Sequence, residues 1–141
     1  MSNWNWLEET LDLQRTAFKI DPPALEGDEF ADYVIWNHTA AVAELTEFLE
    51  ENNWKPWSSI RGRGDRDAAI GELIDVQHFI ANLLVALDCT DEEYEVRYQM
   101  KMQVNRNRQK DGYDGQNKCP RCRRALDDAG VLCTPTNCYG G

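Results

Sequence analysis

Two pairs of carboxylates, each with its members three residues apart, have the spacing that metal chemistry requires. Glu44 and Glu47 lie in the segment ELTEFLEENNW, and Glu72 and Asp75 lie in GELIDVQHF. Both segments have the apolar spacing of an α-helix, so each pair occupies one helix face. Two such faces brought together form a four-carboxylate cage, which suits Mg²⁺ and a phosphate-bearing ligand.

One pair of acids on a helix is usually only a solvated face. The pair of Glu72 and Asp75, however, lies in the most apolar segment of the chain, where an unpaired charge is costly and requires a metal or a partner. The short connection between the two acidic segments predicts antiparallel neighbouring helices.

The elements that must position these acids are helices. Apolar periodicity predicts helices over residues 3–19, 28–53 and 67–88, and a Thr90 to Glu93 capping box starts a fourth that ends near Arg108. Strand signals are nearly absent. We therefore expect an all-α fold, a bundle of about four main helices, with the third helix central and buried on most sides.

Charge is distributed unevenly along the 141 residues. The chain has 25 acidic and 15 basic side chains, a net charge of -10, yet residues 97–141 carry 4 acids and 9 bases. The overall charge disfavours a nucleic-acid coat or an anionic-membrane binder, whereas an acidic body with a basic segment suits cations and polyphosphate. No secretory signal and no run of about 18 apolar residues is found, so we expect a cytoplasmic protein without a membrane partner.

Four cysteines crowd near the C-terminus, and Cys89 stands apart as an expected structural thiol. The four have the count for a zinc site, which we favour over disulfides because the rest of the chain looks cytoplasmic: Cys119, Cys122, Cys133 and Cys138. We expect residues 1–115 to form the helical domain and residues 116–141 a small zinc-knuckle tail. The tail has three possible roles: binding nucleic acid through its arginines, stabilising a dimer, or covering the active site.

Further motifs add a family resemblance. Trp54-Lys55-x-Trp57 and His78-Phe79 accompany the acid pairs, and a block with Lys101, Asn105, Arg108, Gly112 and Tyr113 follows. Over roughly residues 30–115 the sequence resembles the all-α nucleoside triphosphate pyrophosphatases. It is most similar there to the dimeric dUTPases common in phages and some bacteria, with MazG-like enzymes and dCTPases as relatives.

The resemblance implies a role for each matching residue. Glu44, Glu47, Glu72 and Asp75 would hold the Mg²⁺ ions that bridge the triphosphate, and Glu47, or else Glu44, would also orient or deprotonate the attacking water. The implied phosphate and sugar clamp consists of Lys101, Asn105, Arg108 and Tyr113. The implied nucleoside pocket consists of Asn37, His38 and Asn82, with Trp54 or Trp57 stacking and Lys55 beside them.

Each of these residue types also has a purely structural reading. Asn37 and His38 can be helix-face and core residues, the two tryptophans can be packing, and the stripe of Lys101, Asn105 and Arg108 can be an exposed basic face. Pro56 stands between the two tryptophans, where the family pattern has an aromatic residue, so the resemblance does not fix which nucleobase is accepted.

We expect Mg-dependent hydrolysis of dUTP to the monophosphate and pyrophosphate by a homodimer or higher homo-oligomer, in the host-cell cytoplasm if a phage encodes it. The alternatives are a MazG-like or dCTPase-like enzyme acting on another nucleotide, and a nucleic-acid-binding regulator with a non-catalytic helical body.

Overall fold

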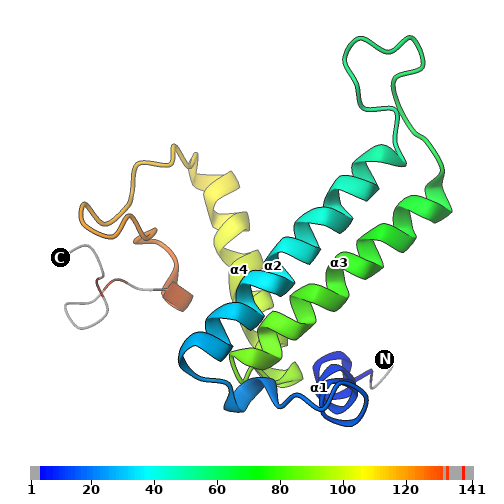
Figure 1. Cartoon of the computed structure of the whole chain (residues 1–141). Helices are drawn as coiled ribbons and strands as arrows, with labels where there is room; N and C mark the ends of the chain where they lie inside the picture. Colours follow the sequence, from blue (N-terminus) through cyan, green and yellow to red (C-terminus); the bar gives the residue numbers. More distant parts are fainter. Residues whose placement is uncertain (1–3, 132, 134–137, 139–141) are drawn as a thin grey trace. The chain divides into compact units, whose positions relative to one another are not determined.

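A helical hairpin formed by α2 (Gly27–Glu50) and α3 (Arg66–Ala86) dominates the computed structural model (Figure 1). The structure describes residues 4–131 together with Cys133 and Cys138. Contacts divide the chain into two compact units, Met1–Asp91 and Glu92–Gly141, and each is described by itself. The predicted boundary between residues 115 and 116 stays a prediction.

The remaining elements are also helical. They are α1 (Trp6–Thr16), η1 (Pro22–Ala24), α4 (Asp91–Asp111) and η2 (Ala129–Val131). Across the described part of the chain no strand forms, only two isolated antiparallel bridges. This confirms the predicted all-α class with four main helices. The observed helix ends lie within three residues of the predicted ones; α2, for example, ends at Glu50 and not at Asn53.

The loop between α2 and α3 is closed by specific backbone contacts. Asn53 and Gly62 exchange two backbone hydrogen bonds of 3.0 and 2.7 Å. A Cβ atom at Gly64 would lie 1.9 Å from the carbonyl oxygen of Glu51, so this close approach requires glycine. Asp65 then caps α3 by accepting hydrogen bonds from the amides of Asp67 and Ala68. The loop therefore fixes the antiparallel register of the two acidic helices.

The N-terminal segment covers the other end of the hairpin. Both α1 and η1 pack against α3, and Leu7 and Val85 are among the largest fully buried side chains. The carboxylate of Asp91 accepts hydrogen bonds from the amides of Leu7 and Glu8, at 2.9 and 3.0 Å, and so satisfies donors at the first turn of α1.

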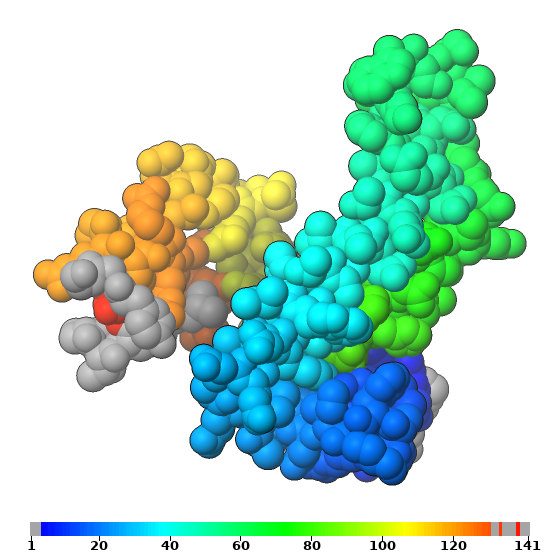
Figure 2. All heavy atoms as spheres, viewed as in Figure 1, coloured from blue at the N-terminus to red at the C-terminus, as the bar shows by residue number. Residues whose placement is uncertain are grey.

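The expectation that the third helix is buried on most sides is wrong for the single chain. Ile70, Leu73 and Ile74 are 39, 40 and 51% exposed, because α2, α1 and η1, which pack against α3, leave these side chains partly uncovered. In Figure 2 the half of the hairpin nearest the α2–α3 loop lies away from the N-terminal segment. By length and composition α3 would also pass as a membrane span, a test that core helices of soluble proteins pass too.

The second unit contains the rest of α4 and a turn around the first two clustered cysteines. Cys119 donates its amide to the carbonyl of Arg124 at 2.8 Å and accepts from the amide of Arg123 at 3.0 Å. Arg123 has a φ of 63°, so the chain reverses through a left-handed residue. This turn brings the sulfurs of Cys119 and Cys122 close to those of Cys133 and Cys138, all within 4.8 Å of one another.

Candidate metal and nucleotide site

Three of the four predicted acidic residues meet across the hairpin. Oxygen atoms of Glu44 on α2 and of Glu72 and Asp75 on α3 lie within 4.8 Å of one another. Glu44 and Glu72 are half-buried, and Asp75 is exposed. Carboxylates held this closely are the donor set that Mg²⁺ and Ca²⁺ prefer, and their mutual repulsion is relieved when a cation binds.

The electrostatics of Glu72 show how crowded this acidic cluster is. Partial burial raises the pKa of Glu72 above its usual value, and a hydrogen bond with Glu44 and the charges of Glu47, Glu44 and Asp75 raise this pKa further. Glu47 lies outside the group of three, one turn from Glu44, yet its charge acts on Glu72. The cluster therefore has the charge excess that a divalent cation would neutralise.

A pocket of about 1100 Å³ lies within the first unit, lined by residues of α1, η1, α2, α3 and the segments that join them. The predicted nucleoside residues Asn37 and Asn82 line it. His78 also lines it, and His78 Nδ1 is 3.6 Å from a carboxylate oxygen of Asp75. The pocket and the acidic cluster are therefore neighbours.

A chain of hydrogen bonds fixes the amides in this pocket. Asn37, which is 1% exposed, donates its Nδ2 to the backbone carbonyl of Tyr33 at 2.9 Å, and its Oδ1 accepts from Asn82 Nδ2 at 2.9 Å. Because a backbone carbonyl can only accept, the orientation of both amides follows. Among the described residues Asn37 is the hydrogen-bond partner of the Asn82 side chain, so Asn82 Oδ1 is left to accept from a ligand.

Sequence reasoning missed Gln14 and Tyr33, which complete this network. Tyr33 donates its hydroxyl to Gln14 Oε1 at 2.9 Å, and burial raises the pKa of Tyr33 to about 12, so the phenol stays a neutral donor. Gln14 is buried, seven residues after the buried Leu7 on α1. A polar residue on the apolar stripe of α1 was the available signal.

Aromatic rings form part of the same pocket, although not the rings that the sequence predicted. Trp36 and Phe79 meet edge to face with centroids 6.1 Å apart, and both line the pocket. Trp54 and Trp57 instead pack against each other at 6.4 Å in the 51–65 loop, where Trp57 is 77% exposed. Stacking by these two tryptophans stays a prediction without support from their position in this chain.

The remaining predicted nucleoside residues also lie away from the large pocket. His38 is exposed and does not line it. Lys55, with Trp54, borders a separate polar hollow of about 150 Å³ at the loop. Their predicted contacts with substrate remain untested.

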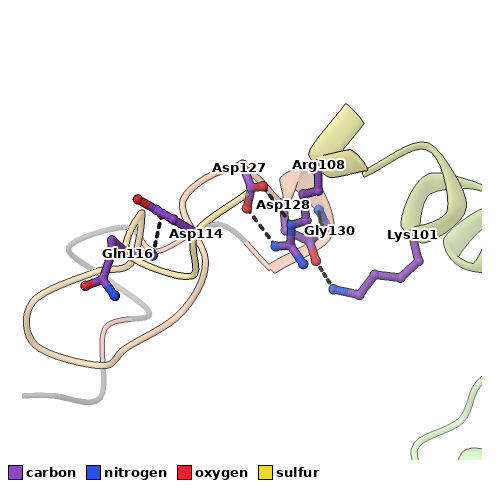
Figure 3. A network of polar contacts seen from close by, with 7 residues as sticks. All are labelled: Lys101, Arg108, Asp114, Gln116, Asp127, Asp128 and Gly130. Carbon is purple, nitrogen blue, oxygen red and sulfur yellow. Dashed lines mark hydrogen bonds and ion pairs between the residues drawn. The ribbon is translucent and has the colours of Figure 1, made fainter. Parts of the chain in front are cut away.

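The predicted phosphate clamp lies in the second unit, with three residues on α4 and Tyr113 just after this helix. Its cations have partners that the sequence analysis did not anticipate (Figure 3). Arg108 donates from Nε and Nη2 to both carboxylate oxygens of Asp127, at 2.8 and 2.7 Å, and Lys101 pairs with Asp128. The Arg108 guanidinium also lies 4.3 Å from the centre of the Tyr113 ring. The clamp residue Asn105 is exposed.

The four clustered cysteines gather as predicted. Cys119 Sγ lies 3.9 Å from Cys138 Sγ and 3.3 Å from Cys133 Sγ, and Cys122 Sγ lies 3.5 Å from Cys133 Sγ. All four thiols are free. Tetrahedral zinc with Zn–S bonds of about 2.3 Å separates its sulfurs by about 3.8 Å, so the cluster fits this ion.

The protonation of these thiols also favours a metal. Hydrogen bonds from the backbone of Cys122 and Arg121 and from Cys133 lower the pKa of Cys119 to about 6. Hydrogen bonds with Cys119 and Cys122 raise the pKa of Cys133. One thiolate therefore forms easily and its neighbour resists ionisation, until a cation compensates the charge.

The fold and the two clusters define a class: an all-helical protein with three carboxylates gathered across a helical hairpin, beside a pocket lined by amides and aromatic rings, and with four clustered cysteines. The sequence profile described as dUTPase matches residues 9–96, more than half of the chain. The chain belongs to this dUTPase family, which supports a nucleotide-pyrophosphatase-like enzyme in general. No curated protein and no solved structure matches the chain significantly.

Proposed function

We propose that the protein hydrolyses dUTP to dUMP and pyrophosphate with Mg²⁺. The observation that carries the proposal is the acidic cluster of Glu44, Glu72 and Asp75 beside an amide-lined pocket, in a chain of the dUTPase family. Asp75 and His78 connect the two, since His78 touches the Asp75 carboxylate and lines the pocket. A nucleoside in the pocket would extend its phosphates toward the carboxylates.

The donor chemistry of the acidic cluster fits magnesium. Glu44, Glu72 and Asp75 would hold the ion, which supplies charge neutralisation for the triphosphate and its leaving group when bound. Glu47 is exposed and does not belong to the group of Glu44, Glu72 and Asp75. Its carboxylate is therefore available to accept a proton from the attacking water. Beyond this, the reaction requires only cationic side chains that bind the phosphates and residues that position the nucleoside.

The orientation of the pocket amides favours uracil. Asn82 Oδ1 is an acceptor, which matches the N3–H donor of uracil, whereas cytosine presents an acceptor at the same ring position. Gln14 accepts from Tyr33 through Oε1, so its amide nitrogen is directed to donate to a base carbonyl. The rings of Trp36 and Phe79 supply apolar surface for the base.

The proposed phosphate and sugar clamp consists of Lys101, Asn105 and Arg108 on α4 and of Tyr113 just after this helix. This assignment rests on their charge, on their helical spacing and on the family resemblance. In the tail, the cysteine cluster holds a structural Zn²⁺, supported by its sulfur spacing and by the lowered pKa of Cys119.

The working form is a homodimer in the cytoplasm. An apolar stripe on α2 and α3 is exposed in the single chain at steps of three, four and seven residues; it consists of Ile35, Val42, Leu45, Leu49, Ile70, Leu73 and Ile74. A second copy would bury this stripe, which is larger than scattered surface residues account for.

A nucleotide panel tests the proposal. Purified protein with Mg²⁺ is given dUTP, dCTP, dTTP, dATP and a set of modified nucleotides, and pyrophosphate is measured. We expect release from dUTP above all others. Preference for another nucleotide would overturn the dUTP assignment in favour of a MazG-like or dCTPase-like activity. If no nucleotide releases pyrophosphate, the assignment as a nucleotide pyrophosphatase is wrong.

A further inference from the structure

The tail presents two consecutive acids to the two cations of the proposed phosphate clamp. Asp127 binds Arg108 and Asp128 binds Lys101, and the two basic residues lie seven positions apart on one stripe of α4 (Figure 3). Each acid therefore neutralises one cation of the stripe. All four residues belong to the second unit.

The Arg108 pair occupies the edge that a phosphate needs. The two carboxylate oxygens of Asp127 accept hydrogen bonds from Nε and Nη2 of Arg108. A guanidinium uses these same paired donors to bind a carboxylate or a phosphate in bidentate fashion. Asp127 and a phosphate group are thus alternative ligands of the same edge. The tight pairing also lowers the pKa of Asp127, so the carboxylate stays charged and competes at neutral pH.

The Lys101 pair couples the cation to tail packing. Asp128 is 1% exposed, and its Oδ1 accepts from the amide of Gly130 at 3.0 Å while its Oδ2 pairs with Lys101. A buried carboxylate is costly without its counter-ion. When Lys101 binds another anion, the packing of Asp128 is weakened, and by reciprocity docking of the tail lowers the affinity of Lys101 for that anion.

The cysteine cluster holds the segment that carries the two acids. Asp127 and Asp128 lie between Cys122 and Cys133, whose sulfurs are 3.5 Å apart, so the cluster closes the loop in which they stand. Closing a loop of this length removes conformational freedom that would otherwise oppose the two ion pairs. Metal binding at the cysteines therefore favours the docked arrangement.

We propose that the metal-bound tail is an internal competitor of substrate phosphate, with Asp127 and Asp128 masking Arg108 and Lys101 until the tail releases them. The proposal rests on the proposed function, in which these two cations bind the triphosphate. It assigns the tail a regulatory role: loss of the metal uncovers the clamp, and high substrate concentration displaces the acids.

The test measures binding of magnesium pyrophosphate to the full-length, zinc-loaded protein by calorimetry, which does not depend on turnover. Asp127→Asn and the double variant with Asp128→Asn keep the side-chain shapes and remove the charges. We expect each to bind pyrophosphate about tenfold or more tightly than the wild type. The matched control is Asp114→Asn, whose carboxylate accepts from the Gln116 amide in the same unit, and it should bind like the wild type.

Zinc removal provides the second arm. Stripping zinc from the wild type with a zinc-selective chelator, with Mg²⁺ restored, should raise pyrophosphate affinity to that of the double variant, and stripping the double variant should add nothing. Unchanged or weaker binding in Asp127→Asn, whose folding and zinc content are checked, would overturn the masking. This outcome differs from failure of the proposed function, which would appear as no nucleotide cleavage in any variant.

Discussion

Asn82 donates a 2.9 Å hydrogen bond across the helical hairpin to Oδ1 of the fully buried Asn37, and this contact sets the polarity of the pocket. The backbone carbonyl of Tyr33 anchors the other end of Asn37, so neither amide can turn without losing a buried hydrogen bond. The relationship fixes the orientation of both amides, and the Oδ1 of Asn82 is the acceptor that we propose reads the base.

Replacing Asn82 with alanine should therefore reduce base selectivity. Removing the acceptor forfeits a hydrogen bond of about 1–3 kcal/mol in a buried site, so kcat/KM for dUTP should fall about tenfold or more while that for dCTP changes little. Steady-state kinetics on both nucleotides measure the ratio. Asn107→Ala on the exposed surface of α4 is the control. An unchanged dUTP-to-dCTP ratio would show that Asn82 does not read the base.

Neutralising Glu72 should stabilise the metal-free protein and abolish its response to magnesium. Because the pKa of Glu72 is raised in the folded state, the folded protein holds this proton more tightly than the unfolded chain. Stability therefore declines as pH rises from the ordinary carboxyl pKa through the raised one, and Glu72→Gln removes that decline. Melting temperatures at several pH values, with and without Mg²⁺, measure both effects.

The control for this experiment is Glu50→Gln, an exposed acid near the end of α2. It should melt like the wild type and keep the stabilisation by Mg²⁺. If Glu72→Gln is also stabilised by Mg²⁺ as strongly as the wild type, the cation binds elsewhere.

Zinc content should depend on the four clustered cysteines and not on Cys89. Cys119→Ser is expected to lose most bound zinc, because a closed four-sulfur site tolerates no missing ligand, whereas Cys89→Ser should retain one ion per chain. Zinc should also be released as pH falls below about 6, the pKa of Cys119, since protons then compete for the sulfur. Elemental analysis after dialysis measures both. Equal zinc in the two variants would contradict the site.

A charge on the exposed α2–α3 stripe should prevent dimer formation. Leu45→Lys places an ammonium group in the stripe, where a second copy would have to bury it, so light scattering should report a monomer. Leu87→Lys, at an exposed position just after α3, should leave the dimer intact. A dimeric Leu45→Lys, or a monomeric wild type, would exclude this interface.

The sequence predicted the helices and the cysteine cluster well because both depend on local patterns. Apolar periodicity predicts α1 to α3, and a capping box predicts the start of α4. The meeting of Glu44 with Glu72 and Asp75 follows once α2 and α3 form a hairpin. The exposed face of α3 was not predicted, because apolar content alone does not show how many neighbours a single chain supplies.

Residues brought in from distant segments were harder to predict. Gln14 lies on α1 and meets Tyr33 of α2 only in the folded chain, where α1 packs on α3, a tertiary relationship with no local signature. Asp127 likewise reaches Arg108 through a loop whose path the cysteine turn determines. Positions of this kind depend on which surfaces the helices bury against each other, and single-sequence periodicity carries little of that information.

The most direct test of the central claim is pyrophosphate release from dUTP by the wild type and by Asp75→Asn and Glu47→Gln, each with Mg²⁺ or EDTA and with circular dichroism to confirm folding. We predict release by the wild type only with Mg²⁺, a loss of at least about a hundredfold in kcat for both variants, and near wild-type release by Glu50→Gln. Full activity in both folded variants, or release that persists in EDTA, would contradict the assignment of the acidic cluster as the catalytic metal site.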